Sequence, residues 1–327
     1  MKTEDTSKLA AGHASARRKV TVVGAGAVGS TFCYSLAQSG LAGEIVLIDQ
    51  NRDLARGQVL DLVHGQPYFP PVAIRTGEAA DYAESQLIVV TAGAAQRPGE
   101  TRLQMVAKNA AVMRAIAADI VAAAPEAVIL VVSNPVDIMT QVMLETTGRD
   151  RSRVIGSGTV LDSARLRQKL GARFNVDVHN VHGYVLGEHG DSEFVAWSLT
   201  HVAGMPVETY HSLNGGGDWA KARDLIQQEV RDSAYHIIDY KGATWFAVGL
   251  ALVRIAAAVL RGQSSILTIS TLLRGEYGLE NVCLSVPCRV STGGMESIVV
   301  APLPREELAL LHASAATLAA VKRDLAG

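Results

Sequence analysis

The chain has 327 residues, of which 48% are hydrophobic and 19% charged, so it is long enough for two domains with a sizeable core. Its formal net charge of −2 lacks the basic excess of nucleic-acid-binding proteins. No apolar run reaches the roughly 18 residues that span a bilayer. The three cysteines, Cys33, Cys283 and Cys288, form no CxxC pair. Their odd number argues against a disulfide framework and favours a reducing compartment, which predicts a cytoplasmic protein.

The N-terminal segment, residues 1–18, is polar and lacks the apolar core of a secretory signal. We predict that it is a flexible extension. An arm that docks on another subunit is the alternative.

A β-branched run at 19–23 is followed by the glycine-rich hexapeptide GAGAVG and by a helical stretch to about Ser39. A strand, GxGxxG and a helix in this order are typical of dinucleotide-binding folds. The first glycine permits the tight turn, the second lets the backbone approach a pyrophosphate, and the third allows close packing of helix on strand. A helix N-terminus binds such an anion. The predicted cofactor-binding residues of this loop are Gly24, Gly26, Ala27, Val28 and Gly29.

A second strand, 44–48, ends in Asp49, which lies 20 residues after Gly29. This is the usual spacing for the acid that accepts hydrogen bonds from the ribose hydroxyls of the cofactor. A carboxylate at this place also repels a 2′-phosphate. The sequence therefore predicts NAD rather than NADP as the cofactor, and it predicts no metal site.

Strands and helices continue to alternate through the first half of the chain. We expect strands at 72–75, 87–91 and 128–132, with helices at 54–64 and 101–124. This alternation predicts a doubly wound parallel sheet of the Rossmann type. Ligands bind at the carboxyl ends of the strands of such sheets. The residues predicted there as further cofactor contacts are Thr91, Ala92, Gly93 and Asn134.

The second half changes character and predicts an α+β substrate domain. We place the boundary near Ser157, giving an NAD-binding domain at 19–157 and a catalytic domain at 158–327. Helices are expected at 161–174, at 219–260 with a kink at 241–244, and at 305–322. Strands are expected at 181–186, 194–200, 266–273, 282–284 and 298–300.

The strand at 181–186 breaks into Gly187-Glu188-His189-Gly190-Asp191. Glycines on either side let a histidine approach a small substrate, and an unperturbed histidine pKa of about 6.5 suits proton transfer near neutral pH. Carboxyl groups follow closely, the last at Glu193. A surface turn with a solvated histidine is the alternative at this point of the argument.

Five motifs then appear in a specific order: VVGAGAVG, TAGAAQRPGETR, SNPVD, GSGTVLDSARLR and GEHGDSE. From residue 19 onwards the chain resembles the bacterial L-lactate dehydrogenases of the lactate/malate dehydrogenase superfamily. This resemblance implies reversible hydride transfer between NADH and pyruvate, which gives L-lactate and NAD.

The resemblance also implies a role for each catalytic residue. His189 acts as the acid/base, and Asp162 fixes its tautomer and stabilises the imidazolium. Arg165 lies on the same helical face as Asp162 and binds the substrate carboxylate with a two-pronged pair. Arg102 stabilises negative charge on the reacting oxygen once its loop has closed. The alternatives are a helix N-cap for Asp162 and solvated positions for the two arginines.

Substrate choice is implied to rest on Gln96, six residues before Arg102. Malate dehydrogenases carry arginine at this position, which pairs with the second carboxylate of oxaloacetate, whereas neutral Gln96 suits the methyl group of pyruvate. The sequence RPG that follows is a departure towards the malate enzymes, and a shift of one residue would place Arg97 in the pocket.

Three further pocket positions follow from the resemblance. Asn134 is expected to hydrogen-bond the substrate or the nicotinamide ribose, Thr244 to line the substrate pocket, and Val248 to line the nicotinamide face. For Thr244 and Val248, packing in a kinked helix is an equally good interpretation.

The resemblance also implies a homotetramer and an allosteric site. Arg167 and His182 occupy the two places at which an arginine and a histidine bind fructose 1,6-bisphosphate in activated bacterial enzymes. We expect His182 to begin the strand whose other end carries His189, so that one stiff element joins effector to catalysis. A solvated helix arginine and an ordinary strand histidine are the alternative.

Other functions stay open at this stage. The nearest are a malate dehydrogenase and a 2-hydroxyacid dehydrogenase for longer chains. A protein that binds NAD as a sensor without catalysis belongs to a different class.

Overall fold

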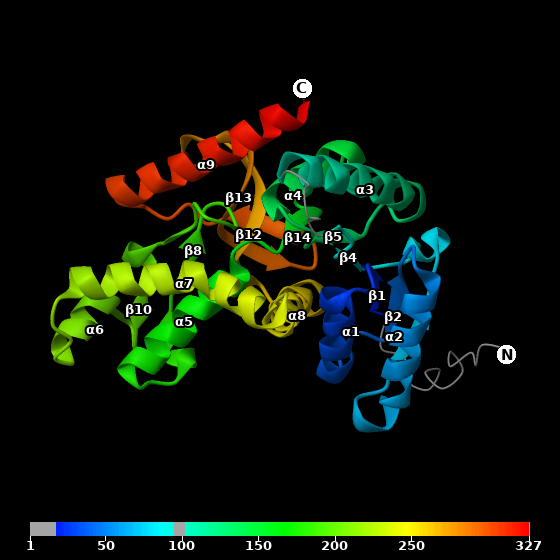
Figure 1. Ribbon diagram of the computed structural model, residues 1–327, viewed down its shortest axis with the longest axis horizontal. Coiled ribbons are helices and arrows are strands. Elements are labelled where there is room, and N and C mark those ends of the chain that lie inside the picture. Colours follow the sequence, from blue (N-terminus) through cyan, green and yellow to red (C-terminus); the bar gives the residue numbers. More distant parts are fainter. Residues whose placement is uncertain (1–17, 95–101, 327) are drawn as a thin grey trace.

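One sheet of nine strands runs through the molecule, in the order β3-β2-β1-β4-β5-β6-β12-β13-β14 (Figure 1). The structure is a computed structural model that describes residues 18–94 and 102–326. The predicted N-terminal extension and the loop carrying Gln96 lie outside the described residues, apart from Arg18.

The first six strands are parallel and carry the order 3-2-1-4-5-6 of a dinucleotide-binding fold. Every residue of β1, β4 and β5 is buried, as expected for parallel strands covered on both faces. The predicted Rossmann-type sheet is therefore confirmed. The strands are β1 (Lys19–Val23), β2 (Glu44–Ile48), β3 (Ala73–Thr76), β4 (Leu87–Val90), β5 (Val128–Val131) and β6 (Val154–Gly156).

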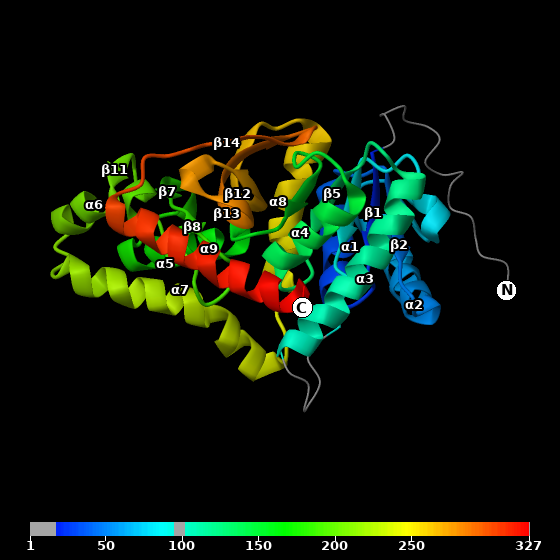
Figure 2. The same cartoon turned by 90° about the horizontal axis from the view of Figure 1, so that it is seen from above.

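Helices cover the two faces of this parallel part, α1 and α2 on one side and α3 and α4 on the other (Figures 1 and 2). They are α1 (Ala27–Ser39), α2 (Arg52–His64), α3 (Arg102–Ala123) and α4 (Val136–Thr147). Helix α4 was not predicted. Its first nine residues, 136–144, are all buried, so it lacks the one-sided apolar pattern that marks a surface helix.

The last three strands extend the same sheet in antiparallel fashion. They are β12 (Ser265–Arg274), β13 (Glu280–Ser291) and β14 (Gly294–Ile298). Strand β12 joins β6 where Ser270 pairs with Gly156. A Cβ atom on Gly156 would lie 2.4 Å from Thr140 Oγ1, so glycine is required for this close approach. The predicted short strand at 282–284 is wrong in length, because pairing on both sides continues β13 to 12 residues.

The long helices of the second half are α5 (Val160–Phe174), α7 (Trp219–Lys241), α8 (Phe246–Arg261) and α9 (Arg305–Ala326). The predicted interruption at 241–244 is confirmed. Helix α7 ends at Lys241, and Gly242 follows with a φ of 85°, in the left-handed region that favours glycine. Helix α8 packs against α1, where a Cβ on Gly249 would meet Thr31 Cγ2 at 2.8 Å.

Short strands form two further sheets. One contains β7 (Val181–His182), β10 (His201–Val202) and β11 (Met205–Pro206), and the other contains β8 (Val185–Leu186) and β9 (Phe194–Val195). A short helix, α6 (Val207–Leu213), follows β11. The 3₁₀ helices are Gln66–Tyr68, Ala79–Tyr82, Val178–Asn180, Trp197–Leu199 and Glu276–Gly278.

Two predicted strands are therefore wrong in extent. The segment 181–186 divides at Gly183 into β7 and β8, which pair in different sheets. A Cβ on Gly183 would lie 2.9 Å from Leu166 Cδ2, so this glycine marks a close approach to α5. The segment 194–200 is a strand only to Val195 and continues as a 3₁₀ helix at 197–199. None of the helices described in the structure has the length and apolar character needed to cross a bilayer.

Candidate active site

The three glycines of the loop after β1 meet different surroundings. Gly24 has a φ of 108°, and a Cβ there would lie 2.6 Å from Thr91 Oγ1. A Cβ on Gly29 would lie 1.9 Å from the Gly24 carbonyl oxygen, so α1 could not pack so closely. A Cβ on Gly26 would meet nothing within 4 Å, which leaves open space beside the backbone at the start of α1.

This open space adjoins unused hydrogen-bond donors. Gly26 caps α1 without a side-chain hydrogen bond, and the first turn carries no acidic residue. Free N–H groups and the helix dipole therefore favour an anion at this end. Asp49, which follows β2, accepts hydrogen bonds at 2.7 Å from the backbone N–H groups of Ala25 and Asn51. The anion-binding helix end and the anchored carboxylate together fit NAD.

Asn109 of α3 joins the two loops at the carboxyl ends of β4 and β5. Its Oδ1 accepts from the Ala94 N–H at 2.8 Å, and its Nδ2 donates to the Asn134 carbonyl at 3.0 Å. Ser133 adds a hydrogen bond of 2.5 Å to the Ala92 carbonyl. The sequence analysis did not identify Asn109, although a polar residue inside the apolar face of a predicted helix was a usable signal.

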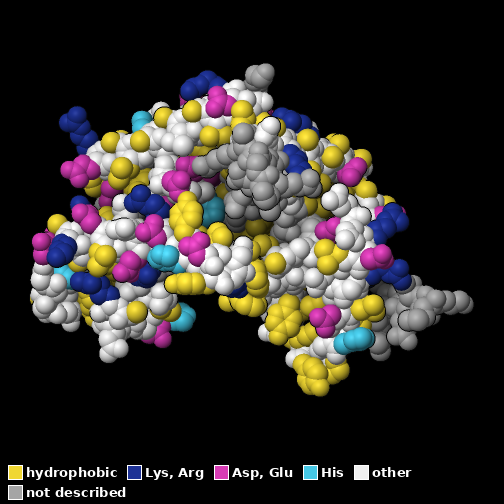
Figure 3. All heavy atoms as spheres, viewed as in Figure 1, with side chains coloured by type: hydrophobic (Ala, Val, Ile, Leu, Met, Phe, Trp, Pro, Cys, Tyr) yellow, Lys and Arg dark blue, Asp and Glu magenta, His cyan; other side chains and the backbone are white. Residues whose placement is uncertain are grey.

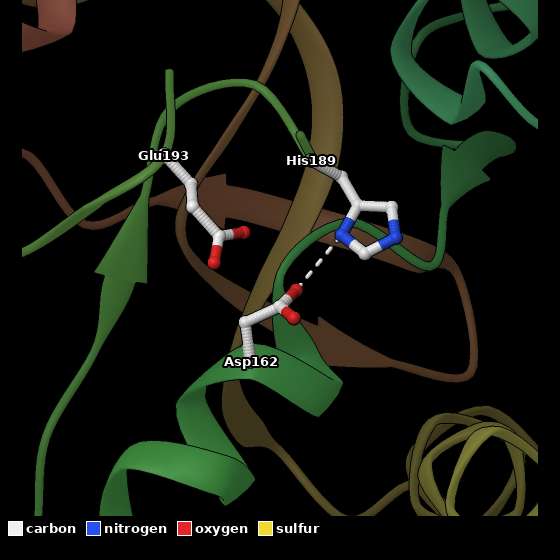
Figure 4. A group of neighbouring side chains, drawn as sticks. All are labelled: Asp162, His189 and Glu193. Carbon is white, nitrogen blue, oxygen red and sulfur yellow. Dashed lines mark hydrogen bonds and ion pairs between the residues drawn. The ribbon is translucent and has the colours of Figure 1, made fainter. Parts of the chain in front are cut away.

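Asp162 and His189 form the centre of the site, and Figure 4 shows the hydrogen bond that joins them. Asp162 lies in the first turn of α5, and its Oδ2 is 2.8 Å from His189 Nδ1. Its Oδ1 accepts from Arg165 Nη1 at 2.6 Å. The Asp162 side chain is 1% exposed and that of His189 is 27% exposed. The aspartate is thus a buried anchor, while the second ring nitrogen of His189 is directed away from it.

The backbone of His189 has its own buried anchor. Asp137 of α4 accepts from the His189 N–H at 2.8 Å and from the Ser270 hydroxyl at 2.5 Å. Burial raises the pKa of Asp137 to about 6, against the opposing effect of these two hydrogen bonds. The motif SNPVD contains this residue, but the sequence analysis gave it no role because its partners are 52 and 133 positions away.

The C-terminal helix also holds the catalytic turn. The Ser314 hydroxyl of α9 accepts from the Glu188 N–H at 2.6 Å and lies 2.9 Å from the Ser192 hydroxyl. Gly187 leaves room for this contact, since a Cβ there would lie 2.8 Å from Ser314 Oγ. Ser314 is fully buried and was not predicted.

The charges around the pair hold it in an ionic state. Burial alone would lower the pKa of His189, but the charge and hydrogen bond of Asp162, with the charges of Glu193 and Asp137, raise it to about 9. Burial opposes ionisation of Asp162, yet His189 and Arg165 hold the pKa of this carboxyl below its usual value. The imidazole can therefore carry a proton at neutral pH.

Glu193 is the third titratable group of the cluster. The candidate ligand atoms of Asp162, His189 and Glu193 lie within 4.8 Å of one another, a spacing that could in principle suit a cation. Both oxygens of Asp162 are already bonded to the side chains of His189 and Arg165, and the guanidinium would repel a metal ion. The arrangement favours acid/base chemistry.

The other predicted positions lie around this centre or outside the described residues. Asn134 is exposed at the turn after β5, and Thr244 is half-buried at the break between α7 and α8. Val248 is half-buried on α8 and packs against the main core. Arg102 begins α3, but its side chain is outside the described part, as is the whole of Gln96.

The two predicted effector residues lie on different elements. Arg167 of α5 donates from Nη2 to the Val178 carbonyl at 3.3 Å, and its Nε is buried without a partner among the described residues. His182 is exposed on β7, opposite His201 of β10. The expectation of one stiff strand joining His182 to His189 is wrong, because the chain leaves the sheet of β7 before it enters β8.

The sheet order, the glycine loop with Asp49 and the buried aspartate–histidine pair together define an NAD-dependent oxidoreductase. Comparison with known proteins agrees with this class. The lactate/malate dehydrogenase NAD binding domain matches residues 18–156, and the α/β C-terminal domain of the same family matches residues 159–326. The chain therefore belongs to the lactate/malate dehydrogenase family.

Individual relatives cover almost the whole chain. An L-lactate dehydrogenase of Treponema denticola is 56% identical over 305 residues, which is 92% of this chain and 96% of that protein. L-lactate dehydrogenase 1 of Clostridium acetobutylicum is 46% identical over 300 residues, with the same shares. Among solved structures, the minor L-lactate dehydrogenase of Enterococcus mundtii superposes with a TM-score of 0.90 at 38% identity, covering 93% of this chain and 97% of that one.

Proposed function

We propose that the protein is an L-lactate dehydrogenase, which transfers a hydride reversibly between NADH and pyruvate. The observation that carries this proposal is the buried hydrogen bond from Asp162 to His189 Nδ1, beside a dinucleotide-binding loop. The relatives named as L-lactate dehydrogenases support the substrate. The proposed division is an NAD-binding domain at 19–157 and a catalytic domain at 158–327.

His189 is the proposed acid/base. Asp162 occupies Nδ1, so the proton exchanged with substrate is held on Nε2. In pyruvate reduction this proton passes to the substrate oxygen, and in lactate oxidation the neutral imidazole removes it. NADH supplies the hydride when it is bound. A His189 pKa of about 9 supports this assignment, because the imidazole is loaded with a proton at neutral pH in the free protein.

Two arginines are proposed to hold the substrate. Arg165 uses one Nη1 atom for Asp162, and its remaining N–H groups make no hydrogen bond within the described residues. These groups are suited to bind a carboxylate next to His189. Arg102 at the start of α3 is proposed to stabilise charge on the substrate oxygen. Asn134 and Thr244 complete the proposed substrate contacts.

The proposed cofactor contacts are the glycine loop (Gly24, Gly26, Ala27, Val28, Gly29), Asp49, the loop after β4 (Thr91, Ala92, Gly93), Asn134 and Val248. Their support is the geometry of the loop and of Asp49 given above.

Pyruvate is proposed over oxaloacetate because Gln96 supplies no positive charge for a second carboxylate. The experiment is the rate of NADH oxidation with pyruvate, oxaloacetate or 2-oxoisocaproate as acceptor. We expect pyruvate to give the largest kcat/KM. A preference for oxaloacetate would assign the chain to the malate branch of the family, and a preference for 2-oxoisocaproate would assign it to the longer-chain enzymes.

The proposed assembly is a homotetramer in the cytoplasm. Its support is an apolar surface on α1, α2, the 3₁₀ helix after α2 and α8, part of which is visible at the lower edge of Figure 3. Large apolar side chains that are more than half exposed make up this surface: Tyr34, Leu60, Tyr68, Phe246 and Leu250. A groove of about 400 Å³ runs between α1 and α2 within it. Exposed apolar surface of this kind is typical of subunit contacts.

Arg167 and His182 are proposed to bind fructose 1,6-bisphosphate at a subunit contact. A two-fold axis would present each cation twice, so that four positive groups face one bisphosphate. Coupling to His189 through one strand is excluded by the division between β7 and β8, and helix α5 is the more direct connection. This helix carries Arg167, Arg165 and Asp162.

A further inference from the structure

Glu193 lies at the acid/base centre, although the proposed reaction gives it no part. It immediately precedes β9, and its side chain is 8% exposed. Its carboxyl group is directed towards Asp162 and His189 (Figure 4). With all three groups within 4.8 Å, its charge acts on the imidazole through little intervening solvent.

Charged groups from three elements surround the cluster. Helix α5 contributes Asp162 and Arg165, and α7 contributes Arg231, whose Nε is buried without a hydrogen-bond partner among the described residues. Helix α4 contributes Asp137, which faces His189. Burial, followed by the charge of Asp162, raises the pKa of Glu193 to about 8, while His189 and the two arginines favour its ionised form.

We propose that Glu193 is a third functional carboxyl of this centre, which acts through His189 by holding the proton on its imidazole. It is a positioning residue in the electrostatic sense and touches neither substrate nor cofactor. The inference rests on the proposed dehydrogenase function and names what sets the pH range of that reaction.

The two titrations are linked because each charge changes the other. As pH rises, Glu193 loses its proton first, and its new negative charge then delays the loss of the His189 proton. Pyruvate reduction consumes one proton from His189 in each turnover, so this delay extends reduction to higher pH. With a neutral side chain at position 193, the imidazole would release its proton at lower pH.

The test compares Glu193→Gln with the wild type across pH 6 to 10. The break in the pH profile of kcat/KM for pyruvate should move to lower pH by about one unit, given one charge at this separation. The pH at which lactate oxidation reaches its plateau should move in the same direction. Well below the break, the rates should change little. A purely structural role would lower rates without moving either break.

Two further variants guard this result. Glu193→Ser, a second neutral variant, should shift the break in the same direction, and Glu193→Asp should restore much of the wild-type position. Glu229→Gln on α7 removes an exposed carboxyl that pairs with Lys169 and should leave the profile unchanged. Unmoved breaks in both neutral variants, or an equal shift in Glu193→Asp, would overturn the proposal.

A substrate-free measurement separates this inference from the proposed function. Diethyl pyrocarbonate modifies neutral imidazole, and peptide mass mapping follows the peptide that contains His189. In Glu193→Gln its modification should begin about one pH unit lower than in the wild type. If the wild type turned over none of the three oxoacids but showed this shift, the proposed function would fail and the role of Glu193 would stand. No shift would refute the role of Glu193 directly.

Discussion

Asp162 holds the catalytic side chains together because each of its oxygens has a different partner. One oxygen fixes His189 and the other fixes Arg165, so one buried carboxylate orients both the acid/base and the proposed carboxylate-binding group. The family motifs identified all three residues from the sequence. Asp137, Asn109 and Ser314 were missed, because each acts through hydrogen bonds to segments far away in the chain. A motif records which residues are present, whereas such supports depend on the packed fold.

Asp49 carries the residue-scale prediction. Its carboxylate is held beside the glycine loop by two backbone N–H groups, where it would repel the 2′-phosphate of NADP. Asp49→Ser should therefore raise the kcat/KM ratio of NADPH to NADH by about 10- to 100-fold, the equivalent of about 1–3 kcal/mol for one charge contact. The measurement is steady-state pyruvate reduction with each cofactor. A wild type that used both cofactors equally would contradict this role of Asp49.

At the scale of elements, regular surface helices and the parallel strands were predictable from periodicity and glycine positions. Helix α4 was not, since its first nine residues are all buried. Strands β7, β8 and β9 were predicted too long, because two-residue strands depend on partners that local sequence does not specify. Strand β13 was predicted too short for the same reason, as its length follows from pairing with β12 and β14.

The turn between β12 and β13 is tied to the parallel sheet by an ion pair. Arg151, just before β6, bonds to the two carboxylate oxygens of Glu276 at 2.7 and 3.3 Å, and also to the Leu272 carbonyl. Burial opposes ionisation, but Arg151 and backbone N–H groups lower the pKa of Glu276 from 4.5 to about 2. This stabilisation is complete above pH 4.5 and is lost as pH falls towards 2.

Glu276→Gln should therefore lower the free energy of unfolding by roughly 1–3 kcal/mol at pH 7, and by progressively less below pH 4.5. Urea unfolding of the variant and the wild type at several pH values measures this difference. Glu126→Gln is the control, because Glu126 is 89% exposed in a 3.8 Å contact with Arg153 and should change stability by less than about 0.5 kcal/mol. A pH-independent loss in Glu276→Gln would mean that packing, not charge, holds the turn.

At the scale of the whole molecule, the fold supplies a single continuous sheet, and the proposed assembly supplies regulation. Family resemblance and an exposed apolar surface point to a tetramer, yet one chain contains only half of the proposed cation cluster at each two-fold contact. The sequence could indicate the residues Arg167 and His182 but not their placement across subunits, since that depends on a second chain.

Fructose 1,6-bisphosphate should lower the half-saturating pyruvate concentration by about 5- to 100-fold, the usual range of allosteric coupling. The measurement is pyruvate saturation with and without the effector, alongside mass determination in solution. Arg167→Gln should abolish activation while the tetramer persists. Identical saturation curves at pH 6 for a wild-type tetramer would refute the effector site, and a monomer at all concentrations would refute the assembly.

The central claim is that the buried pair Asp162–His189 reduces pyruvate with NADH. The most direct test follows NADH oxidation by the wild type and by His189→Asn at neutral pH, and identifies the product with an L-lactate-specific oxidase. We predict L-lactate from pyruvate, little turnover of oxaloacetate, and a loss of about 10²- to 10⁴-fold in the variant, the usual contribution of general acid–base catalysis. Oxaloacetate as the preferred acceptor, or pyruvate reduction undiminished in His189→Asn, would contradict the account.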